Sequence, residues 1–118
     1  MSLDAAFAEL VVADGTARGV VRPERIRRLC EGHFPGDPIV PGAHLVGLMA
    51  DIAGEALAPR SARRELAEVE RASFLARVTP ADVVLVTARR EGATRVRAEI
   101  HTGEACAARA TFRFRTSP

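Results

Sequence analysis

One segment of the chain, Ala43–Ala58, predicts a single long helix and limits the folds that the rest can form. It begins after Pro41-Gly42, stops before Pro59, and carries apolar residues around nearly its whole circumference. A helix of this kind has to be wrapped by other structure, because a helix on a surface keeps a polar face. One small sheet cannot cover it on every side. We therefore expect a second copy to cover the rest, in a homodimer or an assembly of dimers with adjoining sheets.

The rest of the chain predicts mainly antiparallel strands. Turn signals at Asp14-Gly15, Glu91-Gly92 and Thr102-Gly103 separate short segments that are apolar or alternate between apolar and polar residues. The charged segment Glu24–Glu31 is expected to be irregular or to form one helical turn. The pattern predicts an α+β fold in one domain of residues 1–118, with a curved antiparallel sheet wrapped around one helix. The expected strands are Leu10–Ala13, Ala17–Arg22, Leu66–Arg77, Asp82–Arg90, Thr94–His101 and Ala105–Arg115.

The amino-acid composition restricts the chemistry. All 17 basic residues other than histidine are Arg, and the chain has no Lys, Tyr, Trp, Asn or Gln. This excludes Schiff-base catalysis, a Tyr acid or base, and a phosphate loop that needs Lys. Proton transfer is left to His33, His44 and His101, to fifteen carboxylates and to two thiols. Cys30 and Cys106 lie far apart and outside any CxxC pattern, so we expect neither a disulfide framework nor a metal site.

Charge and hydropathy point to an ordinary globular protein. The formal net charge is +2, the arginines are dispersed, and five Phe offer few rings for stacking bases, so we expect no nucleic-acid partner. No apolar run approaches the roughly 20 residues that span a bilayer. The first ten residues also lack the features of a signal peptide. We expect a cytoplasmic protein with no membrane partner and no cofactor.

The segment Gly32–Gly42 reads GHFPGDPIVPG, with three prolines and three glycines in eleven residues. This run resembles the active-site loop of the 3-hydroxyacyl-[acyl-carrier-protein] dehydratases of fatty-acid synthesis. A second match is the pattern F-x-x-x-V-x-P-x-D at residues 74–82. The resemblance extends over roughly residues 10–114. It implies the hot-dog fold, a 3-hydroxyacyl thioester as substrate, and acyl carrier protein or CoA as the carrier.

Removal of water from such a thioester needs a base that takes a proton from C2 and an acid that protonates the leaving hydroxyl group. It also needs hydrogen-bond donors that stabilise negative charge on the thioester oxygen. His33 suits the base, since imidazole titrates near neutral pH and the neighbouring prolines hold it still. The backbone N–H of Gly42, at the start of the helix, suits the developing oxyanion. The predicted substrate-binding residues are Phe34, Pro41, Gly42, Ala43, His44 and Gly47.

The carboxylic acid side chain is missing from the position at which the family has it. In the family a Glu or Asp stands fourteen residues after the His and faces the His of the partner subunit, but here that residue is Gly47. Four residues further, where Gln is usual, this chain has Asp51, on the same helix face as Gly47. Three interpretations stay open. In the first, Asp51, helped by His44, supplies the acid. In the second, the protein binds acyl thioesters while a partner supplies the acid. In the third, His33 or Asp51 activates water for thioester hydrolysis.

Other charged residues have supporting roles in this prediction. Arginines cluster at residues 25–28 and 60–64, on either side of the loop and the helix. A basic rim of this kind would steer an acidic acyl carrier protein. We expect Glu55 to pair with an Arg and His101 to lie at the surface.

Overall fold

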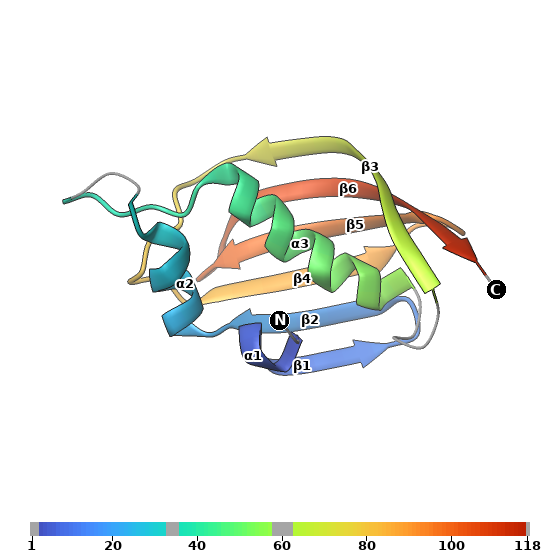
Figure 1. Ribbon diagram of the computed structural model, residues 1–118, viewed down its shortest axis with the longest axis horizontal. Coiled ribbons are helices and arrows are strands. Elements are labelled where there is room, and N and C mark those ends of the chain that lie inside the picture. Colours follow the sequence, from blue (N-terminus) through green and yellow to red (C-terminus); the bar gives the residue numbers. More distant parts are fainter. Residues whose placement is uncertain (1–2, 33–35, 58–62, 118) are drawn as a thin grey trace.

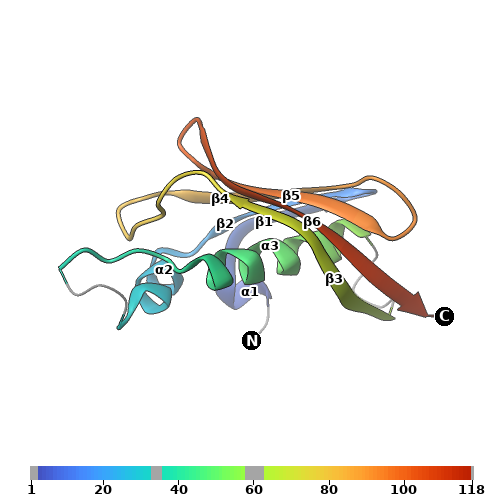
Figure 2. The ribbon, with the colours of Figure 1, turned by 90° about the horizontal axis from the view of Figure 1, so that it is seen from above.

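The computed structural model describes residues 3–32, 36–57 and 63–117. In this part of the chain the helices lie on one side of a single sheet (Figures 1 and 2). None of the described helices is long and apolar enough to cross a membrane. The elements in chain order are α1 (Leu3–Ala6), β1 (Phe7–Ala13), β2 (Thr16–Val21), α2 (Pro23–Cys30), α3 (Gly42–Leu57), β3 (Arg63–Phe74), β4 (Val84–Arg90), β5 (Arg95–Thr102) and β6 (Ala105–Ser117).

The sheet has six strands in the order β1-β2-β4-β5-β6-β3, and all neighbours are antiparallel. Along β5, Val96, Ala98 and Ile100 are buried beneath α3, while the residues between them point to the outer face. This alternation follows from the pleat of a strand, which sends successive side chains to opposite faces. The predicted α+β arrangement of one long helix along a curved antiparallel sheet is confirmed (Figure 2).

Helix α3 lies within one residue of its predicted limits. Leu45, Leu48, Met49 and Ile52 are buried, and α3 contacts most of the strands (Figure 1). The apolar surface of α3 is interrupted by one exposed stripe of small or polar residues, namely Ala43, His44, Gly47 and Asp51. The chain itself therefore covers most of the apolar surface of α3.

Helix α2 is longer than predicted. Residues Pro23–Cys30 form a full helix in place of the expected irregular segment or single turn. Pro23 suits the first helical position because its backbone angle is already helical and that position needs no N–H donor. Ile26, Leu29 and Cys30 follow at helical spacing and are buried. The charged residues between them obscure this short apolar stripe in the sequence.

Strand β3 forms one edge of the sheet and pairs with β6. It begins and ends three residues earlier than predicted, and the following Leu75 and Ala76 donate backbone hydrogen bonds to the carbonyl of Ala107. Several large apolar side chains on and beside this edge strand are exposed: Leu66, Val69, Phe74 and Leu75.

Candidate active site

The described part of the predicted active-site loop is tied to the segment that follows β3. The Val40 N–H donates to the carbonyl of Val78 at 2.8 Å, and Arg77 forms an ion pair with Asp37 at 2.8 Å. The Pro41 carbonyl accepts hydrogen bonds from the N–H groups of the first turn of α3. These contacts fix the position at which the loop enters the helix. His33, Phe34 and Pro35 lie outside the described residues, so the role of His33 as the base stays a prediction.

Gly42 begins α3 beneath an aromatic ring. A Cβ atom at Gly42 would lie 3.1 Å from the ζ carbon of Phe74, closer than an ordinary contact, so a side chain here would displace the ring. The N–H groups of a first helical turn have no acceptor within the helix and can donate to a bound anion. A largely apolar groove of about 460 Å³ runs beside this turn, lined by Ile39, Val40, Gly42, Leu45, Phe74, Leu75, Ala76 and Arg77.

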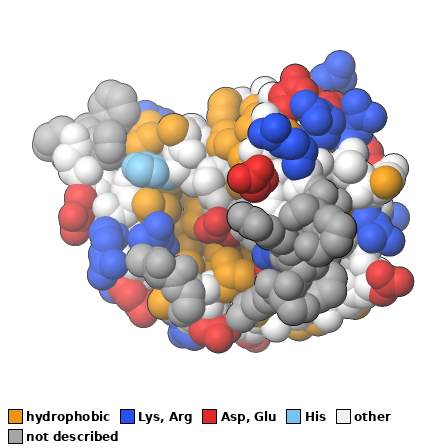
Figure 3. Space-filling model, turned by 45° about the vertical axis from the view of Figure 1, so that its right-hand side comes forward, with side chains coloured by type: hydrophobic (Ala, Val, Ile, Leu, Met, Phe, Trp, Pro, Cys, Tyr) orange, Lys and Arg blue, Asp and Glu red, His pale blue; other side chains and the backbone are white. Residues whose placement is uncertain are grey.

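A smaller pocket of about 140 Å³ lies between α2 and α3. It brings together four of the residues that the sequence predicts for the site, namely Ala43, His44, Gly47 and Asp51. On the helix-bearing side of the molecule, Figure 3 shows a hollow with apolar side chains at its base and acidic and basic side chains around it. The remaining lining comes from Leu48 of α3 and from Arg25 and Leu29 of α2.

Gly47 faces open space in this pocket. A Cβ atom built at Gly47 would meet no atom of the described residues within 4 Å. Close packing against these residues is therefore not the reason for a glycine here, although glycine in a helix interior costs about 1 kcal/mol relative to Ala. The missing side chain leaves room that a ligand, or a longer side chain, can occupy.

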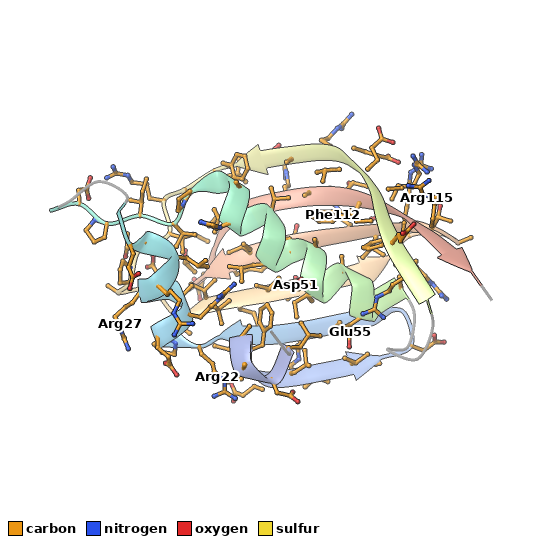
Figure 4. The ribbon with its side chains drawn as sticks, viewed as in Figure 1. Arg22, Arg27, Asp51, Glu55, Phe112 and Arg115 are labelled. Atoms are coloured by element: carbon orange, nitrogen blue, oxygen red, sulfur yellow. The ribbon has the colours of Figure 1, made fainter. Side chains whose placement is uncertain are left out.

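Asp51 lies one turn after Gly47, near the middle of α3 (Figure 4). Loss of solvation in the pocket raises the pKa of Asp51 above its ordinary value. The Arg25 guanidinium opposes this rise, and the nearby Glu55 adds to it. A carboxyl group with a raised pKa keeps its proton to higher pH, which suits a proton donor.

Arg25, predicted only as part of the basic rim, lines the pocket that holds Asp51. Its side chain is half-buried, and its Nε atom is buried with no hydrogen-bond partner among the described residues. A buried donor without an acceptor is costly, and a ligand oxygen in the pocket would remove that cost. The signal in the sequence was the spacing of Arg25 and Leu29, which places both on one helix face.

Glu55 has a structural role. It is the buried charged residue of α3, and it pairs with Arg64 of β3 as predicted (Figure 4 labels Glu55). The pair joins α3 to the edge strand. Because Arg64 is engaged in this way, it does not contribute a freely solvated charge to the expected basic rim.

Among the described residues, the outer face of the sheet holds no predicted catalytic residue. A broad depression of about 620 Å³ lies over β2, β4 and β5, with Arg18, Arg89 and Arg97 in its lining. His101, expected at the surface, is half-buried near this face and lies 3.1 Å from a carboxylate oxygen of Glu99. The candidate active site is therefore on the helix side of the sheet.

Comparison with known proteins gives a family match and several matches of fold. The sequence matches the family described as ApeI-like, ApeI dehydratase, over residues 14–111. No curated protein matches the chain significantly.

Three solved structures illustrate the similarity of fold. The dehydratase heterocomplex ApeI:P from Xenorhabdus doucetiae is 18% identical with a TM-score of 0.71, covering 86% of this chain and 88% of that chain. The protein smu.793 from Streptococcus mutans UA159, bound to acetyl CoA, is 15% identical with a TM-score of 0.74, covering 92% of this chain and 86% of that chain. A mutant hypothetical thioesterase from Streptococcus pneumoniae TIGR4 is 16% identical with a TM-score of 0.74, covering 92% of this chain and 88% of that chain. These matches confirm the hot-dog fold.

Proposed function

The chain belongs to the ApeI-like dehydratase family, and on that premise we propose that it removes water from a 3-hydroxyacyl thioester to give a trans-2-enoyl thioester. The observation that carries this proposal is the pocket between α2 and α3, where Asp51, His44 and Arg25 meet beside the first turn of α3. The neighbouring apolar groove at Phe74 offers a surface for an acyl or pantetheine chain. The reaction belongs to fatty-acid or polyketide-type synthesis.

In the proposed reaction His33 removes a proton from C2 of the substrate. Asp51, in its neutral form, donates a proton to the 3-hydroxyl group, which leaves as water while the C2–C3 double bond forms. The N–H of Gly42 stabilises negative charge on the thioester oxygen. The raised pKa of Asp51 supports its role as the acid. His44 lines the same pocket and helps Asp51.

Arg25 is proposed to bind an oxygen atom of the substrate. Its buried Nε–H group has no acceptor among the described residues, and the side chain lines the pocket that holds Asp51. A guanidinium group donates strong hydrogen bonds to oxygen and keeps its charge at any physiological pH. Arg25 thus adds a function to α2 that the fold alone does not require.

The substrate carrier is proposed to be acyl carrier protein or CoA. Arg27 and Arg28 lie on the exposed side of α2, next to the helix face that lines the pocket (Figure 4 labels Arg27). Such charges raise the rate at which an acidic carrier docks, and the effect falls as salt is added.

The assembly is proposed to be a homodimer or an assembly of dimers, formed through β3. Leu66, Val69 and Phe74 are between 37% and 53% exposed along this edge strand. A second β3 paired alongside would satisfy the open backbone groups of the edge and cover these side chains. The solved ApeI:P structure is a heterocomplex, which supports a different hot-dog subunit as the alternative partner.

Two alternative functions have an observation in their favour. The open space at Gly47 favours an acyl-thioester-binding subunit with little activity of its own, in which a partner supplies the acid. The similarity to a hypothetical thioesterase favours hydrolysis, with Asp51 or His33 activating water.

One assay pair separates these functions. The protein is incubated with 3-hydroxyacyl-CoA and 3-hydroxyacyl-ACP of several chain lengths, and enoyl product and free thiol are measured in parallel. We expect the parent protein to form enoyl product, and His33→Ala and Asp51→Ala to lose this activity. Asp14→Asn, a control in an exposed turn, should keep it. Thiol release without enoyl product would show a thioesterase.

Absence of both products without a partner protein would contradict an enzyme that acts alone. If activity survives in Asp51→Ala, this residue is not the acid. Gly47→Glu restores a carboxylate at the family position, and the space around Gly47 admits it. A gain of activity in this variant would identify a degenerate dehydratase.

A further inference from the structure

Three side chains with different donor atoms meet at the β5–β6 hairpin, away from the proposed active site. They are Glu99 and His101 of β5 and Cys106 of β6, and all three are half-buried. One donor atom from each lies within 4.8 Å of the other two, and His101 Nε2 lies 3.1 Å from Glu99 Oε1. The proposed dehydration uses none of them.

A β-bulge is what brings Cys106 to this group. Ile100 pairs with Ala108 and His101 pairs with Cys106, so Ala107 is an extra residue in β6. Ala108 faces the core, and regular alternation would turn Cys106 to the core as well. The extra residue turns Cys106 to the outer face beside His101, as bulges commonly do when they redirect a side chain.

The bulge is fixed from the neighbouring strand connection. The Ala107 carbonyl accepts hydrogen bonds from the N–H groups of Leu75 and Ala76, at 2.8 Å and 3.1 Å. Glu99 and His101 are two residues apart on one strand, so they share a face whatever their rotamers. The three donors are therefore placed by backbone pairing.

We propose that Glu99, His101 and Cys106 form a binding site for Zn²⁺. A carboxylate oxygen, an imidazole nitrogen and a thiolate sulfur are the three kinds of ligand that zinc takes in proteins. Bonds of about 2.0–2.3 Å in a tetrahedron place the ligand atoms roughly 3.3–3.8 Å apart. The His101–Glu99 pair, at 3.1 Å, is already near that spacing, and because no pair is wider than 4.8 Å, none has to close by more than about 1.5 Å.

Charge balance also favours a divalent ion. A carboxylate and a thiolate together neutralise Zn²⁺, and neutral imidazole completes the three ligands. The fourth position is left for water or an external ligand. Arg109 is paired in register with Glu99, and its positive charge opposes the ion, so we expect a site of moderate affinity.

The test uses the full chain, freed of metal with a chelator and then titrated. Zn²⁺ is titrated by calorimetry, and Co²⁺ is used as a spectroscopic probe for the thiolate bond. We expect one ion per chain and a thiolate-to-cobalt charge-transfer band that is lost in Cys106→Ser. His101→Ala and Glu99→Gln should weaken Zn²⁺ binding at least about tenfold. Glu104→Gln, an exposed change in the turn of the same hairpin, is the matched control and should bind as the parent does.

A melting experiment supplies a second measurement. Zn²⁺ should raise the melting temperature of the parent protein and not that of Cys106→Ser, because an ion that binds the folded state stabilises it. If Cys106→Ser does not fold, His101→Ala and Glu99→Gln decide the matter. The proposal is overturned if the parent binds no Zn²⁺, or if these variants bind it as tightly as the parent.

Discussion

Two glycines of α3 should respond in opposite ways when each is replaced by Ala. At Gly47 a Cβ atom meets nothing within 4 Å among the described residues, so Ala brings its helix propensity without a clash. Gly in a helix interior costs about 1 kcal/mol relative to Ala. We expect Gly47→Ala to raise the free energy of unfolding by about 1 kcal/mol, which corresponds to a rise of about 4 °C in melting temperature.

At Gly54 the same change meets a side chain. A Cβ atom there would lie 2.7 Å from Arg64 Nε, and Arg64 is the partner of Glu55, whose side chain is 2% exposed. The Cβ meets the end of the Arg64 side chain, which has to shift. Losing the ion pair with Glu55 completely would cost about 3 kcal/mol, at the low end of the range for buried pairs because Arg64 itself is 20% exposed, and this sets the upper limit of the cost. After the gain of about 1 kcal/mol in propensity, Gly54→Ala should lower the free energy of unfolding by at most about 2 kcal/mol.

Urea denaturation followed by far-UV circular dichroism measures both changes, provided that unfolding is two-state. Repeating Gly54→Ala in a Glu55→Gln background tests the mechanism, because the cost should shrink once the buried charge is gone. The reasoning fails if Gly54→Ala stabilises the protein as much as Gly47→Ala does. It also fails if Gly47→Ala destabilises the protein, because other atoms would then occupy the space beside residue 47 in solution.

Three further predictions concern the pocket and the edge strand. Asp51→Asn should raise the free energy of unfolding at neutral pH, because partial loss of solvation in the pocket raises the pKa of Asp51 and so disfavours its charged form. Denaturation at several pH values should show this gain fading as the pH falls through the raised pKa, and absent below the ordinary pKa of Asp. Arg25→Met should raise the pKa of Asp51 further and Arg25→Lys should restore it, which carboxyl NMR titration measures without relying on activity. Val69→Glu, at a 37% exposed position of the edge strand β3, should shift sedimentation from the proposed dimer to monomer, whereas an unchanged dimer would contradict an interface through β3.

Local sequence pattern was enough to predict several elements of the fold. The apolar segment between two prolines predicted α3 to within one residue, and Gly-containing turns predicted the β4–β5 and β5–β6 hairpins. The helical spacing of Gly47 and Asp51 placed both on one face of α3, and the structure finds them in one pocket. Such features are predictable because the periods of helices and strands are fixed by backbone geometry over a few residues.

Contacts between distant residues could not be predicted from local pattern. Arg25 comes close to Asp51 because α2 packs beside α3, and no local pattern fixes that packing. Cys106 joins His101 because a bulge changes the face of one strand end, and the bulge is held by the connection after β3. These contacts depend on sheet order, register and helix packing, which arise from the burial of the whole core and not from any short segment.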